Sequence, residues 1–193
     1  MRVAAALTLV LAIVGFPERG AIATRIASED AYPLEVGLRW TYRALGGVTV
    51  TREVVGLREI SEREYFEMRF ALPLLGPRVL PMRRTSDGVV TASGGREILL
   101  MRFPMVAGDR WTIDVPGQPE TAECTVEGEE IIEALGGRRR ATKLRVVRRD
   151  RRTGRESADA EWYVRGIGLA KMEVTYGVRA TFVLERFDQG SRP

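Results

Sequence analysis

Apolar and polar residues alternate along most of the chain with a period of two, which is typical of half-buried β-strands. Helical periodicity is weak, and Gly, Pro and Asp-Gly signals interrupt the alternating runs at short intervals. The pattern predicts ten to twelve strands, at residues 38–45, 48–60, 65–70, 79–84, 89–92, 97–102, 110–115, 121–132, 141–149, 157–164, 169–176 and 178–187.

The short turns between these runs favour an antiparallel meander, because parallel pairing needs long crossover connections. A long antiparallel sheet must close or fold over to protect its edges and bury one face. The sequence therefore predicts an all-β fold, a strongly curved sheet or barrel with the general shape of lipocalins or LolA. Leu38, Trp40 and Tyr42 should face inward. An open β-sandwich is the alternative, and any helix should be short.

One segment occurs twice at a constant spacing of 71 positions. Residues 32–41 read YPLEVGLRWT, and residues 103–112 read FPMVAGDRWT. An aromatic residue, Pro, Gly, Arg, Trp and Thr recur in the same order. This indicates an internal duplication, with halves at about residues 32–102 and 103–187, and it describes architecture rather than chemistry.

The amino terminus has the features of a signal peptide. Arg2 precedes the uncharged apolar run from Val3 to Phe16, and Ala21-Ile22-Ala23 supplies a small-x-small cleavage pattern. We expect residues 1–23 to be removed and residues 24–193 to form a single all-β domain, exported to the periplasm or secreted. No Cys follows the cleavage pattern, so we expect no lipid anchor. The apolar run is too short to span a bilayer.

The composition limits which catalytic groups and metal sites the chain can form. The chain has no His, which removes the common catalytic triads and histidine metal sites, and Cys124 is its one cysteine. Alternation within residues 122–126 places Cys124 on a buried face. Paired carboxylates with catalytic spacing are not evident. We therefore expect a non-enzymatic protein without metal or cofactor.

Several motifs together resemble a known group. They are YPLEVGLRWTY, FPMVAGDRW, the Val126-Glu127-Gly128-Glu129 strand and EWYVRGIGLAKME at residues 161–173. They are similar to a broad group of exported bacterial proteins of unknown function, labelled TapB-like, with FPL-x-x-G-x-x-W and WY-x-x-G-x-GL-x-K boxes. Members often carry a lipid-anchoring Cys and a Pro-Ala-Gly-Thr-Phe segment, and this chain has neither. The resemblance implies an all-β, non-catalytic envelope protein and transfers no active site.

Aromatic residues at alternating positions are candidates for contact with a ligand inside a curved sheet. As core anchors they would serve packing alone, and both interpretations remain open. The candidate ligand-binding residues are Trp40, Tyr42, Trp111, Trp162 and Tyr163.

Arginine is concentrated in the second half, around the predicted hairpin at residues 141–164. The formal net charge of the chain is only +4, so the basic character is local. Arginine binds carboxylates and phosphates bidentately, so this hairpin could contact a protein partner or anionic lipid. A solvated hairpin tip is the simpler interpretation. The candidate contact residues are Arg138, Arg139, Arg140, Arg148, Arg149, Arg151 and Arg152.

Two functional hypotheses follow. The first is a periplasmic carrier or binding protein for a hydrophobic or lipid-like ligand. The second is an interaction or scaffold subunit of a cell-envelope assembly that uses the arginine-rich hairpin. Nucleic acid is not an expected partner, because aromatic residues do not interleave with the arginines. No later apolar segment is long enough to span a membrane.

Overall fold

The computed structural model describes residues 32–44, 46–72, 76–175 and 179–190. The predicted signal peptide, residues 1–23, lies outside them. The described residues form twelve strands, which agrees with the strands expected from the alternating pattern. The strands are β1 (Arg39–Ala44), β2 (Thr49–Ile60), β3 (Arg63–Leu72), β4 (Gly76–Thr85), β5 (Gly88–Ser93), β6 (Arg96–Arg102), β7 (Arg110–Asp114), β8 (Glu120–Ala134), β9 (Gly137–Asp150), β10 (Glu156–Val164), β11 (Gly168–Val174) and β12 (Ala180–Asp188).

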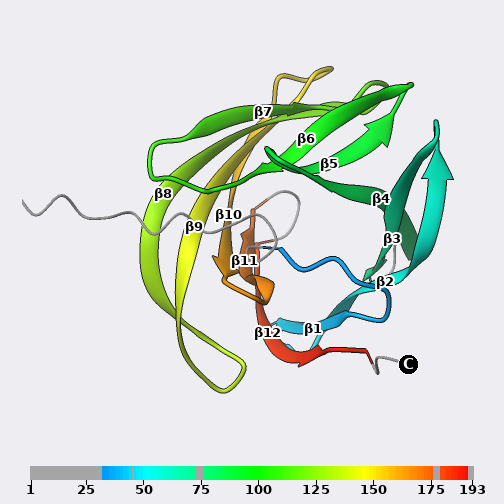
Figure 1. Cartoon of the computed structure of the whole chain (residues 1–193). Helices are drawn as coiled ribbons and strands as arrows, with labels where there is room; N and C mark the ends of the chain where they lie inside the picture. Colours follow the sequence, from blue (N-terminus) through cyan, green and yellow to red (C-terminus); the bar gives the residue numbers. More distant parts are fainter. Residues whose placement is uncertain (1–31, 45, 73–75, 176–178, 191–193) are drawn as a thin grey trace, which may run out of the picture.

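All twelve strands belong to one antiparallel sheet that curves into a nearly closed barrel (Figure 1). The sheet order is β6-β5-β4-β3-β2-β1-β12-β11-β10-β9-β8-β7, so every strand pairs with its chain neighbour except at one place. β6 and β7 run side by side without a backbone ladder, and we call this junction the seam. The predicted meander and barrel are confirmed, and the sandwich alternative is not what the chain adopts.

At the seam, a side chain supplies a contact that the backbone does not. The indole Nε1 of Trp111 on β7 donates to the carbonyl oxygen of Leu100 on β6 at 3.1 Å. The two strands are connected through residues 103–109, and this segment begins with a cis Phe103–Pro104 peptide bond. The barrel is therefore completed at this junction by side-chain contact rather than by a ladder.

The two Gly-containing turns of the repeated segment have the same local geometry. The amide of Gly37 donates to Val54 O at 2.8 Å, and the amide of Gly108 donates to Val126 O at 2.9 Å. Both glycines have φ close to +90°, where a side chain would be strained. The β-bulges at 54/56 in β2 and at 126/128 in β8 also correspond. The duplication of the chain stays a prediction, and these features agree with it.

Residues 32–38 close one end of the barrel, because they cross it from β11 to β2 (Figure 1). Tyr32 and Leu34 are buried there. Leu34 O accepts a hydrogen bond from Arg84 Nη2 on β4 at 3.1 Å, and Tyr32 packs on Gly168, at the start of β11. This segment positions the aromatic side chains of the interior.

Candidate functional site

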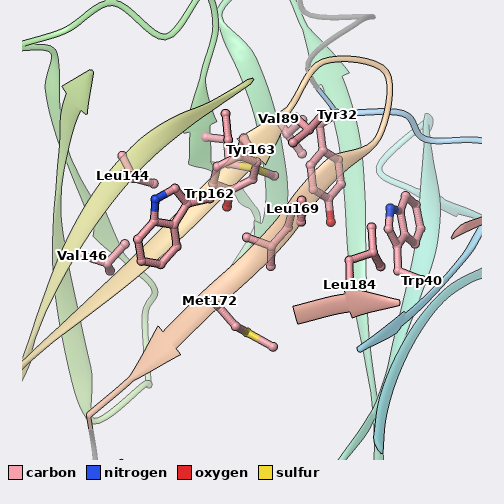
Figure 2. Packing of buried hydrophobic residues seen from close by; sticks show 14 of the residues in the cluster. Tyr32, Trp40, Val89, Leu144, Val146, Trp162, Tyr163, Leu169, Met172 and Leu184 are labelled. Atoms are coloured by element: carbon pink, nitrogen blue, oxygen red, sulfur yellow. The ribbon is translucent and has the colours of Figure 1, made fainter. Parts of the chain in front are cut away.

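Aromatic side chains from distant parts of the chain meet inside the barrel near this closed end. The Tyr32 ring lies 6.1 Å from the Trp40 ring and 6.3 Å from the Tyr163 ring. Figure 2 shows Tyr32 and Tyr163 close together, with Leu169 beside them. Trp40 Nε1 donates to Ile167 O at 2.6 Å. The structure thus brings Trp40 and Tyr163 together on either side of Tyr32. Alternation along β1 predicts that Trp40 points inward, but it cannot predict which residues surround it.

Tyr42 is also part of the interior. It is fully buried, and its hydroxyl donates to Leu169 O on β11 at 2.9 Å. Burial raises the pKa of Tyr42 and of Tyr163, so both phenols stay protonated. Tyr163 donates its hydroxyl proton to the Glu161 carboxylate. Three of the five predicted aromatic residues therefore share one surface of the barrel.

Arg52 on β2 introduces a positive charge into this interior. It alternates with the buried Val50 and Val54 and pairs in register with Trp40 and Phe70, so its side chain points inward. Its position between Val50 and Val54, which both face the core, is the sequence signal that could have identified it as an inward-facing residue. Arg52 was nevertheless missed as a site residue, because an arginine within a strand is usually solvated.

The Arg52 guanidinium is held mainly by aromatic rings. Its central carbon lies 5.6 Å from the centre of the Tyr42 ring and 5.1 Å from that of Phe70. Nη2 donates to Met172 Sδ at 3.6 Å, and Nε is buried without a hydrogen-bond partner among the described residues. Burial lowers the pKa of Arg52, but its acidic neighbours, among them Glu161, outweigh this effect, so the pKa is raised and the group is charged.

The charge of a second interior arginine, Arg148, is balanced by carboxylates. Its Nε donates to Asp159 Oδ2 at 2.9 Å, and its Nη2 lies 3.9 Å from Glu161 Oε1. Asp159 also accepts the amide of Thr175 at 2.8 Å. The interior therefore contains a satisfied ion pair as well as the less satisfied Arg52.

Some inward-facing apolar side chains of the barrel remain partly exposed. Register places them on the same face as the buried Met68 and Met172. The diameter of a barrel grows with its number of strands, so this twelve-stranded sheet has a wider interior than an eight-stranded barrel, which side chains just fill. The partly exposed inward residues are Phe66, Phe70, Leu80, Val174 and Phe182.

The other two predicted aromatic residues do not contact Tyr32. Trp111 faces the same interior, in register with the buried Cys124, but it lies at the seam. Trp162 points to the opposite face of β10 from Tyr163, where Lys171 and Lys143 lie 4.1 Å and 5.5 Å from its ring centre. Its indole donates to Glu130 on β8. Trp162 is thus covered by charged side chains on the outside, and Figure 2 shows it separated from Tyr32.

The predicted arginine surface is divided. Arg138, Arg139 and Arg140 lie at the start of β9, beside the β8–β9 turn, whereas Arg149 lies close to its other end. At about 3.3 Å per residue, the two groups are roughly 35 Å apart along the strand. Arg149 and Arg151 pair with Glu156 and Asp114, Arg152 is exposed, and Arg148 points inward. These residues do not form one contact surface.

An outer-face cluster centres on Glu97 of β6. Its carboxylate accepts bonds from Arg83 at 2.6 and 2.7 Å and from the Tyr65 hydroxyl, and Arg63 lies 3.2 Å away. Burial raises the pKa of Glu97, but the bonds from Tyr65 and Arg83 outweigh it and the pKa is lowered. The carboxylate, the phenol and the guanidinium of this cluster pair with one another, which indicates a structural role.

Reactive and metal-binding groups are sparse in the described part of the chain. Cys124 is buried, as predicted, and burial raises the pKa of its thiol to about 12. Within residues 32–44, 46–72, 76–175 and 179–190, no group of Cys, Asp and Glu side chains could hold a metal ion. The same ranges contain no helix that is long and apolar enough to cross a membrane.

No family model matches the chain, and no curated protein matches it. Some solved structures are similar to it. A protein described as a "putative exported protein with YmcC-like fold" from Bacteroides fragilis is 13% identical, with a TM-score of 0.52. The match covers 83% of this chain and 99% of that one. At this identity the likeness shows a shared fold.

Two further structures are less similar. A "putative lipoprotein" from Parabacteroides distasonis is 14% identical, with a TM-score of 0.45 over 82% of this chain and 99% of that one. The "hypothetical lipoprotein YmcC" from Escherichia coli is 12% identical, with a TM-score of 0.39 over 88% and 92% of the two chains. The TapB-like resemblance is not among these matches and stays a prediction.

Proposed function

We propose that the protein is an exported, non-catalytic carrier that holds an amphipathic, lipid-like molecule inside its barrel. The observation that carries the proposal is the set of inward-facing apolar side chains that remain partly exposed, notably Phe70, Val174 and Phe182. Apolar surface that faces the inside of a wide barrel without being covered is where a hydrocarbon chain would gain most from leaving water.

The closed end supports the same proposal. Tyr32, Leu34 and Trp40 are buried and fill the barrel there, so a ligand would enter from the opposite end. Export is supported by the leader-like pattern of residues 1–23 and by the shared fold with a protein described as a "putative exported protein".

The test is native mass spectrometry of the full chain, expressed with its own leader in a bacterial host and recovered from the periplasm. We expect an additional mass of lipid size that disappears on denaturation. After delipidation, the protein should take up a fluorescent fatty acid. A clean apo mass together with no uptake of the fluorescent fatty acid would contradict the carrier proposal.

A matched pair of variants sharpens this test. Phe182→Lys places a charge among the partly exposed inward side chains and should weaken uptake by about tenfold or more, because a chain would then contact an ammonium group. Val79→Lys adds the same charge at an outward position that is 48% exposed. It should leave uptake unchanged. Equal effects of the two variants would contradict an interior site.

The scaffold alternative has less support, because the candidate arginines lie at two ends of β9 and point to different faces. It would need a partner that contacts only one of these groups.

A further inference from the structure

We infer that Arg52 is the anchor for an anionic headgroup, so that the ligand is an alkyl or acyl chain ending in a carboxylate or phosphate. This inference rests on the proposed carrier function and specifies its ligand class. Arg52 is the interior arginine whose charge the described residues leave least satisfied.

The hydrogen-bonding capacity of Arg52 exceeds its partners. A guanidinium has five N–H donors in a planar fork. In the described chain, Arg52 contacts the neutral phenol of Tyr32 and donates to the thioether of Met172, a weak acceptor, while its buried Nε has no partner. No carboxylate of the described residues lies within the 4.0 Å of an ion pair with it. An enclosed charge without such a partner is costly, and an anion with two oxygens would satisfy it.

The other interior arginines differ from Arg52 in this respect. Arg148 forms an ion pair with Asp159 at 2.9 Å. Arg84 also has a buried Nε without a partner among the described residues, but its Nη2 donates to the Leu34 carbonyl at 3.1 Å. Glu161, the carboxylate that acts on Arg52 from a distance, already accepts the Tyr163 hydroxyl.

The location of Arg52 fits a headgroup with a chain attached. Its guanidinium lies over the Phe70 ring, and Met172, its sulfur partner, pairs in register with Phe182. Arg52, Phe70 and Phe182 all keep some exposure. An anion on Arg52 would therefore place its hydrocarbon chain directly against the partly exposed apolar surface. A neutral lipid would leave the guanidinium donors unsatisfied.

The experiment compares three ligands with the same chain on the delipidated wild-type protein: laurate, lauryl phosphate and lauryl alcohol, titrated by displacement of a fluorescent fatty acid. We expect at least one of the two anions to bind about tenfold to a hundredfold more tightly than the alcohol, as a charge-assisted bidentate contact would give. A preference between laurate and lauryl phosphate identifies the headgroup.

Variants assign the preference to Arg52. Arg52→Met keeps a long apolar side chain and should abolish the preference for anions, while binding of lauryl alcohol persists. Arg58→Met is the matched control, because Arg58 lies on the same strand, is 58% exposed and pairs with Glu67 on the outside. If Arg52→Met fails to fold, Arg52→Lys keeps the charge without the planar fork and should retain only part of the preference.

The outcomes separate the two proposals. Equal binding of the alcohol and the anions by the wild-type protein, or an anion preference that survives in Arg52→Met, would overturn the role of Arg52 and leave the carrier function standing. Binding of none of the three ligands would overturn both.

Discussion

Cys124 lies in the wall of the barrel, where it pairs in register with Trp111 on β7 and Val146 on β9. Its side chain is 1% exposed. Burial raises the pKa of the thiol to about 12, with a further contribution from Glu161. The thiolate, which is the nucleophile, is therefore scarce at neutral pH in the folded protein.

We expect the native protein not to react with Ellman's reagent at pH 8, and to release one equivalent of the thiolate product in denaturant. The unfolded thiol ionises at a pH of about 8.5, whereas the folded thiol keeps its proton to about pH 12. Because the folded state holds the proton more tightly, this group makes folding less favourable as the pH rises through that window. Rapid reaction of the native protein would contradict the burial of Cys124.

Arg52 shows how far a residue can be interpreted from sequence. Its alternation with Val50 and Val54 could have placed it inward, but an arginine in a strand is usually solvated, so residue type favoured the outside. Register with Trp40 and Phe70 settles its direction. Trp162 and Tyr163 present the opposite case. They were predicted as a pair, and adjacent residues of a strand point to opposite faces.

At the scale of the strand, the turn signals predicted which strands exist better than they predicted where each strand ends. Every predicted strand exists, because Gly, Pro and Asp-Gly signals separate runs with a clear period of two. β9 begins at Gly137 instead of residue 141, since Arg138, Arg139 and Arg140 pair with Glu133, Ile132 and Ile131 of the long β8. A run of arginines has no apolar alternation, so the sequence could not show this extension.

The hairpin of β4 and β5 depends on one glycine. Gly88 has φ +147°, and a Cβ atom there would lie 1.8 Å from the carbonyl oxygen of Met101. Gly88→Ala should therefore destabilise the protein by about 3 kcal/mol or more, since both the strained backbone and the overlap with β6 must be relieved. Chemical denaturation followed by tryptophan fluorescence measures this loss.

Gly137→Ala is the control for that substitution. A Cβ atom added at Gly137 would have no neighbour within 4 Å, and the φ of Gly137 is not positive. The change in the free energy of unfolding should therefore stay within about 0.5 kcal/mol. Similar losses in the two variants would show that the contact with Met101 does not limit this turn.

At the scale of the whole molecule, the barrel has one weak junction, the seam between β6 and β7. The Trp111–Leu100 hydrogen bond crosses it in place of a ladder. Trp111→Phe keeps an aromatic ring but removes this bond, and it should lower the free energy of unfolding by about 2 kcal/mol through the lost bond and the reduced packing.

The seam also predicts where the loss appears. Hydrogen exchange should accelerate in β6 and β7 of Trp111→Phe, while β1 and β12, which share a backbone ladder, stay protected. Trp40→Phe is the comparison, because the Trp40 indole bonds to Ile167 O at the closed end, away from the seam. Uniform acceleration across all strands in Trp111→Phe would mean that the seam does not open on its own.

The sequence indicated a curved meander, but not where it would close. Alternation defines strands and faces, whereas closure depends on the total twist and on which edges meet. The crossing of residues 32–38 through one end also depends on long-range contacts, such as that between Arg84 and Leu34. The local pattern of a sequence does not reveal such long-range contacts.

The ladder between β1 and β12 has a consequence for how the protein is made. It provides the backbone pairing between strands β1–β6 and strands β7–β12. β12 is the last of the twelve strands in chain order, so β1 has no partner at this edge until the other ten strands have emerged, whether from the ribosome or on the far side of a membrane. Unpaired edges promote aggregation during that interval. A nascent chain stalled before Ala180 would therefore consist of two open sheets that need a chaperone, and the barrel would close only with the final strand.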